Sequence, residues 1–173
     1  MLRSRIIPCL LIHKNGLVKT INFKDPKYVG DPINAVKIFN EKKVDEIMVL
    51  DIDASVQGNE PNYELISKLA NECRMPLCYG GGVINASQAQ DIVSVGFEKV
   101  SISNAALENI DIIEDIASNV GSQSVVLCLD VRRSNSSYTI YSHRGKKEWN
   151  LNFVDFCIDL NLFRFCKLFN FDD

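Results

Sequence analysis

The stretch Ile47-Met48-Val49-Leu50-Asp51-Ile52-Asp53, "IMVLDID", is apolar over four consecutive positions and ends with two carboxylates. A strand with one face in water alternates apolar and polar residues, so an unbroken apolar run indicates a strand buried on both faces. Strands of this kind occur mainly in parallel sheets covered by helices. Similar runs occur at residues 6–12, 76–79, 100–102 and 125–131. The sequence therefore predicts five parallel strands.

Segments with helical spacing separate these runs, and each begins or ends with a capping residue. Asp31 precedes Pro32, which places an acidic N-cap before a proline at the first helical position. The other boundaries are Pro61 for the second helix, Asn85 or Ser87 to Gly96 for the third, and Asn109 to Gly121 for the fourth. This alternation predicts either a doubly wound sheet or a (β/α)₈ barrel, and the spacing of roughly 25 residues between the later strands favours the barrel.

The last forty residues depart from this alternation. Residues 137–142 alternate and lead into a basic turn, which predicts a β-hairpin inserted after strand five. Residues 151–160 are expected to form a fifth helix, and residues 162–173 are rich in phenylalanine. A (β/α)₈ barrel normally needs about 250 residues. The expected fold is thus α/β, the N-terminal portion of a (β/α)₈ TIM barrel with about five βα units in residues 1–161, not closed within one chain, followed by an aberrant tail.

Composition limits the possible partners of this 173-residue chain. A net charge of -3 and a pI of about 5.4 argue against a dominant nucleic-acid or anionic membrane surface. Neither a signal peptide nor an apolar stretch long enough to cross a bilayer is recognisable. The six cysteines contain no CxxC pair, which is typical of reduced thiols in a cytoplasmic protein.

Phosphate-binding candidates lie where parallel strands end. The triple glycine at residues 80–82 allows backbone N–H groups to approach an anion, although a tight turn would need the same glycines. Ser103 and Asn104 follow the next strand and either complete that cradle or cap a helix. Lys19 either reaches a phosphate or is simply exposed.

Carboxylates provide the other candidates for chemistry. Asp130 follows a buried strand, where it is either a general acid or base or the ion-pair partner of Arg132 or Arg133. Asp51 and Asp53 form no metal-ligand set with a histidine, so structural hydrogen bonding is the better interpretation. His13 is interpreted as a solvated loop residue, and His143 likewise. We expect neither a metal nor a cofactor.

The segments "RIIPCL", "GLVKTINF", "DEIMVLDIDAS", "YGGGV", "EKVSISNAALEN", "GSQSVVLCLDV" and "YTIYSHRGKK" follow one another from residue 5 to about residue 147. Together they resemble the HisF family, the cyclase subunits of imidazole glycerol phosphate synthase. The resemblance implies a TIM barrel that accepts ammonia from a glutaminase (HisH-like) partner. It also implies a phosphorylated substrate, PRFAR, which is converted to imidazole glycerol phosphate and AICAR in histidine biosynthesis.

The resemblance also assigns residues. It implies Asp130 as the strand-five catalytic acid, and it places the substrate's phosphate near Lys19, Gly81, Gly82, Ser103 and Asn104. Arg5, Glu46 and Lys99 correspond to the charged gate through which ammonia enters, and Gln123 also matches. The order Ser103-Asn104 departs from the usual Asn-Thr.

Leu11 occupies the position of the family's second catalytic aspartate, and leucine cannot transfer a proton. Losing one of two cooperating acid–base groups costs about 10²–10⁴ in rate. Three functions therefore remain open. They are a HisF-type cyclase subunit, an altered partner subunit for ammonia delivery in surface-polysaccharide sugar amidation (as in the similar WbuZ-like proteins), and an inactive truncated remnant of a longer barrel.

Two expectations concern the end of the chain and its assembly. The phenylalanine-rich tail motivates the hypothesis of a frameshift or premature end near residue 161. An incomplete barrel would leave strands one and five as unpaired edges, which predicts aggregation or a homodimer formed through the open barrel edges.

Overall fold

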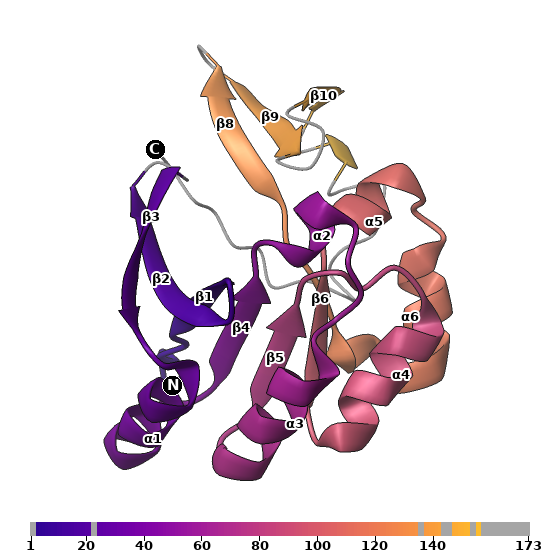
Figure 1. Ribbon diagram of the computed structural model, residues 1–173. Coiled ribbons are helices and arrows are strands. Elements are labelled where there is room, and N and C mark those ends of the chain that lie inside the picture. The colour runs from indigo at the N-terminus through magenta and orange to yellow at the C-terminus, as the bar shows by residue number, and fades with distance from the viewer. Residues whose placement is uncertain (1–2, 22–23, 135–136, 143–146, 153–154, 157–173) are drawn as a thin grey trace.

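The computed structural model describes residues 3–21, 24–134, 137–142, 147–152 and 155–156. Figure 1 shows a curved sheet whose parallel strands point toward the end of the fold where a smaller sheet, coloured orange to yellow, lies. The aberrant tail expected at residues 162–173 lies outside the described residues, as does most of the predicted fifth helix.

The larger sheet has seven strands in the order β3-β2-β1-β4-β5-β6-β7. Strands β1, β4, β5, β6 and β7 run parallel to one another, which confirms the five parallel strands predicted from the apolar runs. Among the described residues this sheet is open. The strand bounds are β1 Cys9–His13, β2 Gly16–Ile21, β3 Lys24–Gly30, β4 Ile47–Asp51, β5 Leu77–Gly80, β6 Lys99–Ile102 and β7 Val125–Leu127.

Successive residues of these strands bury against different clusters. Ile47 and Val49 of β4 join the main core, whereas Met48, between them, joins a smaller cluster with Cys78 and Val126. Side chains of a strand point alternately to its two faces, so the two clusters lie on opposite faces of the sheet. Burial on both faces explains why the strand sequences are continuously apolar.

Helices α1, α3, α4 and α6 pack on one side of the sheet (Figure 1). Asp31 caps α1 by accepting a hydrogen bond from the Asn34 N–H, and Asn85 caps α4 in the same way through the Gln88 N–H, as the sequence predicts. The bounds are α1 Pro32–Lys42, α2 Ala54–Gln57, α3 Tyr63–Glu72, α4 Ala86–Val95, α5 Asn104–Glu108, α6 Ile112–Val120 and the 3₁₀ turn η1 Ser122–Ser124.

The hairpin of β2 and β3 corrects the prediction that strand one is an unpaired edge. β2 pairs antiparallel with β1 through Leu11↔Val18 and Ile12↔Leu17, and β3 then pairs antiparallel with β2. Lys14 and Asn15 form the connecting turn with φ values of 48° and 63°. This hairpin was missed because β3, "KDPKYVG", is exposed at six of its seven residues and shows no apolar alternation.

The smaller sheet contains β8 Asp130–Ser134, β9 Ser137–Ser142 and β10 Lys147–Asn152, all antiparallel, in the order β10-β9-β8. It confirms the predicted hairpin after strand five. The predicted helix over residues 151–160 is wrong at its beginning, because residues 151 and 152 belong to β10. Their backbone pairs with β9, and that pairing satisfies groups that a helix would otherwise satisfy internally.

Candidate functional site

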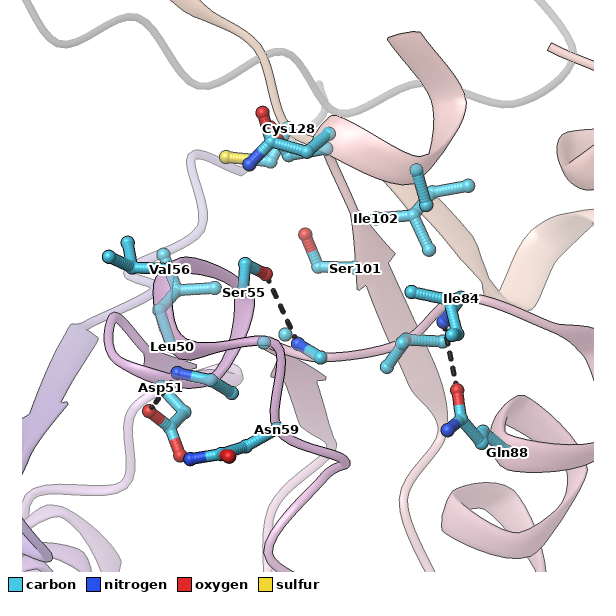
Figure 2. Close-up of a pocket in the computed structure, with 18 of the residues that line it drawn as sticks. Leu50, Asp51, Ser55, Val56, Asn59, Ile84, Gln88, Ser101, Ile102 and Cys128 are labelled. Carbon is cyan, nitrogen blue, oxygen red and sulfur yellow. Dashed lines mark hydrogen bonds between the residues drawn. The ribbon is translucent and has the colours of Figure 1, made fainter. Parts of the chain in front are cut away.

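A cavity of about 1080 Å³ lies at the carboxyl ends of the parallel strands (Figure 2). Its lining comes from β1, β4, β5 and β6, from the loops that follow them, and from the beginning of β8. The carboxyl ends of parallel strands are where α/β folds place their ligands. Of the residues predicted for a site, the cavity lining includes Leu11, Gly81, Gly82, Ser103, Asn104 and Asp130.

The glycine loop packs too tightly against its neighbours for side chains. A Cβ on Gly81, whose φ is +121°, would lie 2.5 Å from the backbone oxygen of Asp51. A Cβ on Gly82, at φ +74°, would lie 2.5 Å from the backbone oxygen of Asn59. The Gly82 N–H donates to Ser55 Oγ at 3.3 Å (Figure 2). These contacts account for the glycines structurally, and phosphate binding by the loop stays a prediction.

Ser103 and Asn104 stand at the beginning of α5 on the cavity wall. Ser103 occupies the N-cap position of α5, and its carbonyl oxygen accepts hydrogen bonds from the N–H groups of Ala106 and Leu107, but its side chain makes no capping hydrogen bond. Asn104 Oδ1 accepts a hydrogen bond of 2.5 Å from Ser142 Oγ, which lies on β9. Thus, the smaller sheet contacts a residue of the cavity directly.

Asp130 and Leu11 both line the cavity: Leu11 is on β1, whereas Asp130 begins β8 of the smaller sheet, after the last parallel strand, β7. Asp130 is half-buried and begins β8, whereas β7 ends three residues earlier at Leu127. The sequence reading therefore placed the strand boundary too late but the carboxylate correctly at the rim. Leu11 pairs in register with Leu50 of β4, so two leucines lie side by side at the cavity floor.

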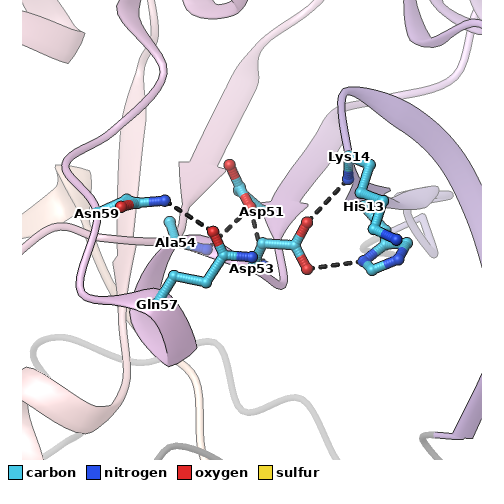
Figure 3. A network of polar contacts seen from close by, with 7 residues as sticks. All are labelled: His13, Lys14, Asp51, Asp53, Ala54, Gln57 and Asn59. Atoms are coloured by element: carbon cyan, nitrogen blue, oxygen red, sulfur yellow. Dashed lines mark hydrogen bonds and ion pairs between the residues drawn. The ribbon is translucent and has the colours of Figure 1, made fainter.

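Asp51 and Asp53 make the structural hydrogen bonds predicted for them (Figure 3). Asp51 Oδ1 accepts from the N–H groups of Asp53 and Ala54 at 2.9 and 3.1 Å. Asp53 Oδ1 lies 2.7 Å from His13 Nδ1, and its Oδ2 accepts from the Lys14 N–H at 2.8 Å. Burial raises the pKa of the Asp51 carboxyl, and the two backbone hydrogen bonds oppose that shift.

The interpretation of His13 as a solvated loop residue is wrong. His13 is the last residue of β1, its side chain is 26% exposed, and it pairs with Asp53. The pairing links two segments forty residues apart, which no local pattern reveals.

Lys19 lies apart from the other predicted phosphate ligands. It is exposed on β2, and the cavity lining includes its neighbour Thr20 instead. Side chains alternate between the faces of a strand, so Lys19 and Thr20 point to opposite sides of β2. Its contact with a phosphate stays a prediction.

Arg5, Glu46 and Lys99 meet at the end of the sheet opposite the cavity. Glu46 Oε2 lies 2.8 Å from Arg5 Nη2 and 2.8 Å from Lys99 Nζ, although Glu46 is only 2% exposed. Three segments supply these residues, namely the chain before β1, the residue before β4 and the first residue of β6. The structure thus brings together all three members of the predicted gate. Gln123 is exposed in η1.

The described part of the chain lacks two further features. It contains no group of three or more histidine, cysteine, aspartate or glutamate residues arranged to hold a metal ion. None of its helices has the length and apolar character needed to cross a membrane. Four of the six cysteines lie in this part of the chain: Cys9, Cys73, Cys78 and Cys128.

Comparison with known families gives a match over most of the chain. The model of the family described as "Histidine biosynthesis protein" matches residues 5–165. The chain belongs to this histidine biosynthesis protein family. Membership confirms the resemblance drawn from the sequence motifs, and it agrees with the alternating β/α units and the open parallel sheet of a partial barrel.

Several curated members of the family are similar over nearly the whole chain. A protein of Vibrio vulnificus (strain YJ016) named "Putative imidazole glycerol phosphate synthase subunit hisF3" is 53% identical over 158 residues, 90% of this chain and 61% of that protein. A Leptospira borgpetersenii protein named "Putative imidazole glycerol phosphate synthase subunit HisF" is 55% identical over 157 residues, which are 90% of this chain and 62% of that protein. "Imidazole glycerol phosphate synthase subunit HisF" of Lactococcus lactis subsp. cremoris (strain SK11) is 40% identical over 157 residues, 90% and 61% of the two chains.

The chain spans about 60% of the length of these curated relatives.

Three residues that lie in or next to the cavity were not identified from the sequence. Thr20 and Ser55 line the cavity, and Ser142 contacts Asn104. Single hydroxyl residues in loops and strands carry little sequence pattern, so they could not be singled out from the sequence.

Proposed function

We propose that the chain forms part of a HisF-type imidazole glycerol phosphate synthase subunit that admits ammonia at the Arg5–Glu46–Lys99 cluster and uses it on a phosphorylated substrate in the cavity. The observation that carries this proposal is the arrangement of three zones along one face of the sheet. A charged cluster lies at one end, an apolar zone in the middle and the cavity at the other end.

The middle zone is continuous in strand register. Cys9 of β1 lies opposite Met48 of β4, which lies opposite Cys78 of β5, and Cys78 lies opposite Lys99 of the charged cluster. The cluster of Met48, Cys78 and Val126 also packs against Leu50, which lines the cavity. An apolar environment strongly disfavours an ion, so this zone suits neutral ammonia better than ammonium.

Within the cavity, Asp130 is the group proposed to transfer protons. Its carboxylate begins β8 at the rim, next to the loop that carries Ser103 and Asn104. We propose that Gly81, Gly82, Ser103 and Asn104 bind one phosphate of the substrate. With Leu11 in place of a second acid, Asp130 acts with water as the other proton carrier, at a rate lower by about 10²–10⁴ than with two acids.

A second candidate function rests on Leu11 itself. The Leu11–Leu50 pair makes the cavity floor apolar where the cyclase chemistry needs a carboxylate. A subunit of this kind still delivers ammonia, but to an acceptor other than PRFAR, such as a sugar in surface-polysaccharide amidation. In this candidate function, the charged cluster and the apolar zone still serve ammonia delivery, but no cyclisation takes place.

The test is turnover of PRFAR with ammonium chloride as the nitrogen source, so that no glutaminase partner is needed. We expect slow formation of AICAR by the unmodified chain, loss of that activity in Asp130→Asn, and a faster reaction in Leu11→Asp. Equal rates for the unmodified chain and Asp130→Asn would refute the proposed role of Asp130. No turnover even in a folded Leu11→Asp variant would favour the second candidate.

A further inference from the structure

Ser142 connects the smaller sheet to the wall of the cavity. Its hydroxyl donates a 2.5 Å hydrogen bond to Oδ1 of Asn104, across 38 positions of sequence. Ser142 is 7% exposed and ends β9, whereas Asn104 is half-buried, begins α5 and lines the cavity. The contact is therefore sheltered from water and reaches a residue that a ligand would touch.

The direction of this hydrogen bond decides what Asn104 offers to a ligand. A side-chain amide has a carbonyl end that only accepts and an NH₂ end that only donates. Because Ser142 donates to Oδ1, the Nδ2 group is the end left for a ligand. An NH₂ group attracts a phosphate or carboxylate oxygen, whereas an exposed Oδ1 would repel it. A rotation of the amide by half a turn would thus reverse its preference.

Neighbouring strands hold the hydroxyl in place. β9 pairs along its length with β8, and Tyr141, the residue before Ser142, lies opposite Asp130 at the cavity rim. The pairing fixes Ser142 at a constant position relative to Asp130. The hydrogen bond holds the Asn104 side chain at the cavity wall before any ligand arrives, and such preorganisation lowers the cost of binding.

We propose that Ser142 is a positioning residue that holds the Asn104 side chain at the cavity wall, where its Nδ2 group can donate to an anionic oxygen of the substrate, most simply a phosphate. The smaller sheet then contributes to anion specificity without touching the ligand. This inference deepens the proposed function, because it rests on phosphate binding near Asn104.

The experiment measures the dissociation constant of inorganic phosphate for the whole chain by NMR titration, with thermal melts to verify folding. In Ser142→Ala we expect binding to weaken about 3- to 10-fold, the range for one lost hydrogen bond. Ser142→Thr keeps the hydroxyl and is expected to restore affinity. Ser124→Ala is the matched control, because Ser124 is also 7% exposed but lies in η1, outside the cavity lining.

Asn104→Asp separates this inference from the proposed function. It replaces the donor with a carboxylate, so we expect phosphate affinity to fall more than tenfold. If Asn104→Asp weakens binding and Ser142→Ala matches Ser124→Ala, the positioning role is refuted while phosphate binding stands. If Asn104→Asp binds phosphate as well as the unmodified chain, both are overturned. A Ser142→Thr variant that folds but stays as weak as Ser142→Ala would also refute positioning through the hydroxyl.

Discussion

Glu46 forms ion pairs with two cationic side chains although its own side chain is almost completely buried. Its side chain is 2% exposed, and Oε2 receives both the Arg5 and Lys99 contacts at 2.8 Å. Taking a carboxylate out of water is costly, and only close opposite charges and hydrogen bonds offset that cost. Lys99, which is 16% exposed, depends on Glu46 in turn, whereas Arg5 is 45% exposed and retains water.

Glu46→Gln is expected to destabilise the fold, because the variant leaves Lys99 half-buried without its counter-charge. Removing one member of a buried charged group typically costs about 3–5 kcal/mol, and an amide that still accepts a hydrogen bond lowers this to about 1–3 kcal/mol. Urea unfolding measures the loss. Glu64→Gln is the control, because the Glu64–Lys68 pair on α3 is exposed and its loss should be undetectable. Equal stability of the two variants would contradict a structural role for Glu46.

The raised pKa of the Asp51 carboxyl implies that the stability of the fold depends on pH, and it gives the direction of that dependence. Burial raises its pKa in the folded state above the ordinary 3.8, so the folded chain holds this proton more readily than the unfolded chain. As the pH rises above 3.8, the unfolded chain ionises at Asp51 before the folded chain does, and the free energy of unfolding falls. Asp51→Asn cannot ionise, and it keeps an acceptor for the Asp53 and Ala54 N–H groups.

We expect Asp51→Asn to gain stability relative to the unmodified chain as the pH rises above about 4, until Asp51 is fully ionised in the folded chain. Urea unfolding of both proteins at several pH values gives the difference directly. A difference that stays constant over this range would show that the buried carboxyl is not the source.

At the scale of elements, the glycine loop fits into a space bounded by other backbone. Gly81 and Gly82 combine positive φ with near contacts to the carbonyl oxygens of Asp51 and Asn59. Gly58, at φ +71°, nearly matches the φ of Gly82, which is +74°, but has nothing within 4 Å of its added Cβ. The chain therefore offers a matched pair that separates backbone strain from steric overlap.

Gly82→Ala is expected to lower stability by about 2–4 kcal/mol and to displace the loop, because its Cβ would meet backbone atoms of Asn59 and Glu60. Gly58→Ala should cost only about 1 kcal/mol, the cost of the left-handed conformation. Thermal or urea unfolding measures both. Similar losses in the two variants would mean that the loop can move away, which would weaken the case for a rigid cradle.

How far sequence predicts these elements depends on where their partners lie. Asp31 and Asn85 were recognised because a cap and its helix are adjacent in sequence, and the five parallel strands because burial on both faces leaves a continuous apolar run. The pairing of His13 with Asp53 and the donation from Ser142 to Asn104 join distant segments. The β3 strand was missed because its pairing is made by backbone groups while its side chains face water.

At the scale of the molecule, the two edge strands of the larger sheet differ in chemistry. β3 carries Lys24, Pro26 and Lys27, which are residues that discourage pairing with another chain. β7, "VVL", pairs with β6 alone among the described strands and carries none of them. Of the two edges first expected to be open, the strand-one edge is thus covered and blunted by the hairpin, and only the strand-five edge is a candidate for association.

We therefore expect self-association to involve β7 and to leave β3 unaffected. Hydrogen exchange at two protein concentrations should show amides of β7 becoming protected at the higher one, with unchanged exchange in β3. Sedimentation velocity over the same concentrations gives the stoichiometry. A monodisperse, cooperatively unfolding monomer with concentration-independent exchange would defeat the prediction of a homodimer through the open edge.

The paired leucines at the cavity floor have a consequence for every charge above them. Leu11 and Leu50 present a hydrocarbon surface that polarises far less than water or a carboxylate would. Once a ligand displaces water from this floor, the effective dielectric constant falls and the field of Asp130 reaches farther with less screening. An apolar floor at Leu11 and Leu50 therefore amplifies the electrostatic influence of Asp130 on a ligand above it.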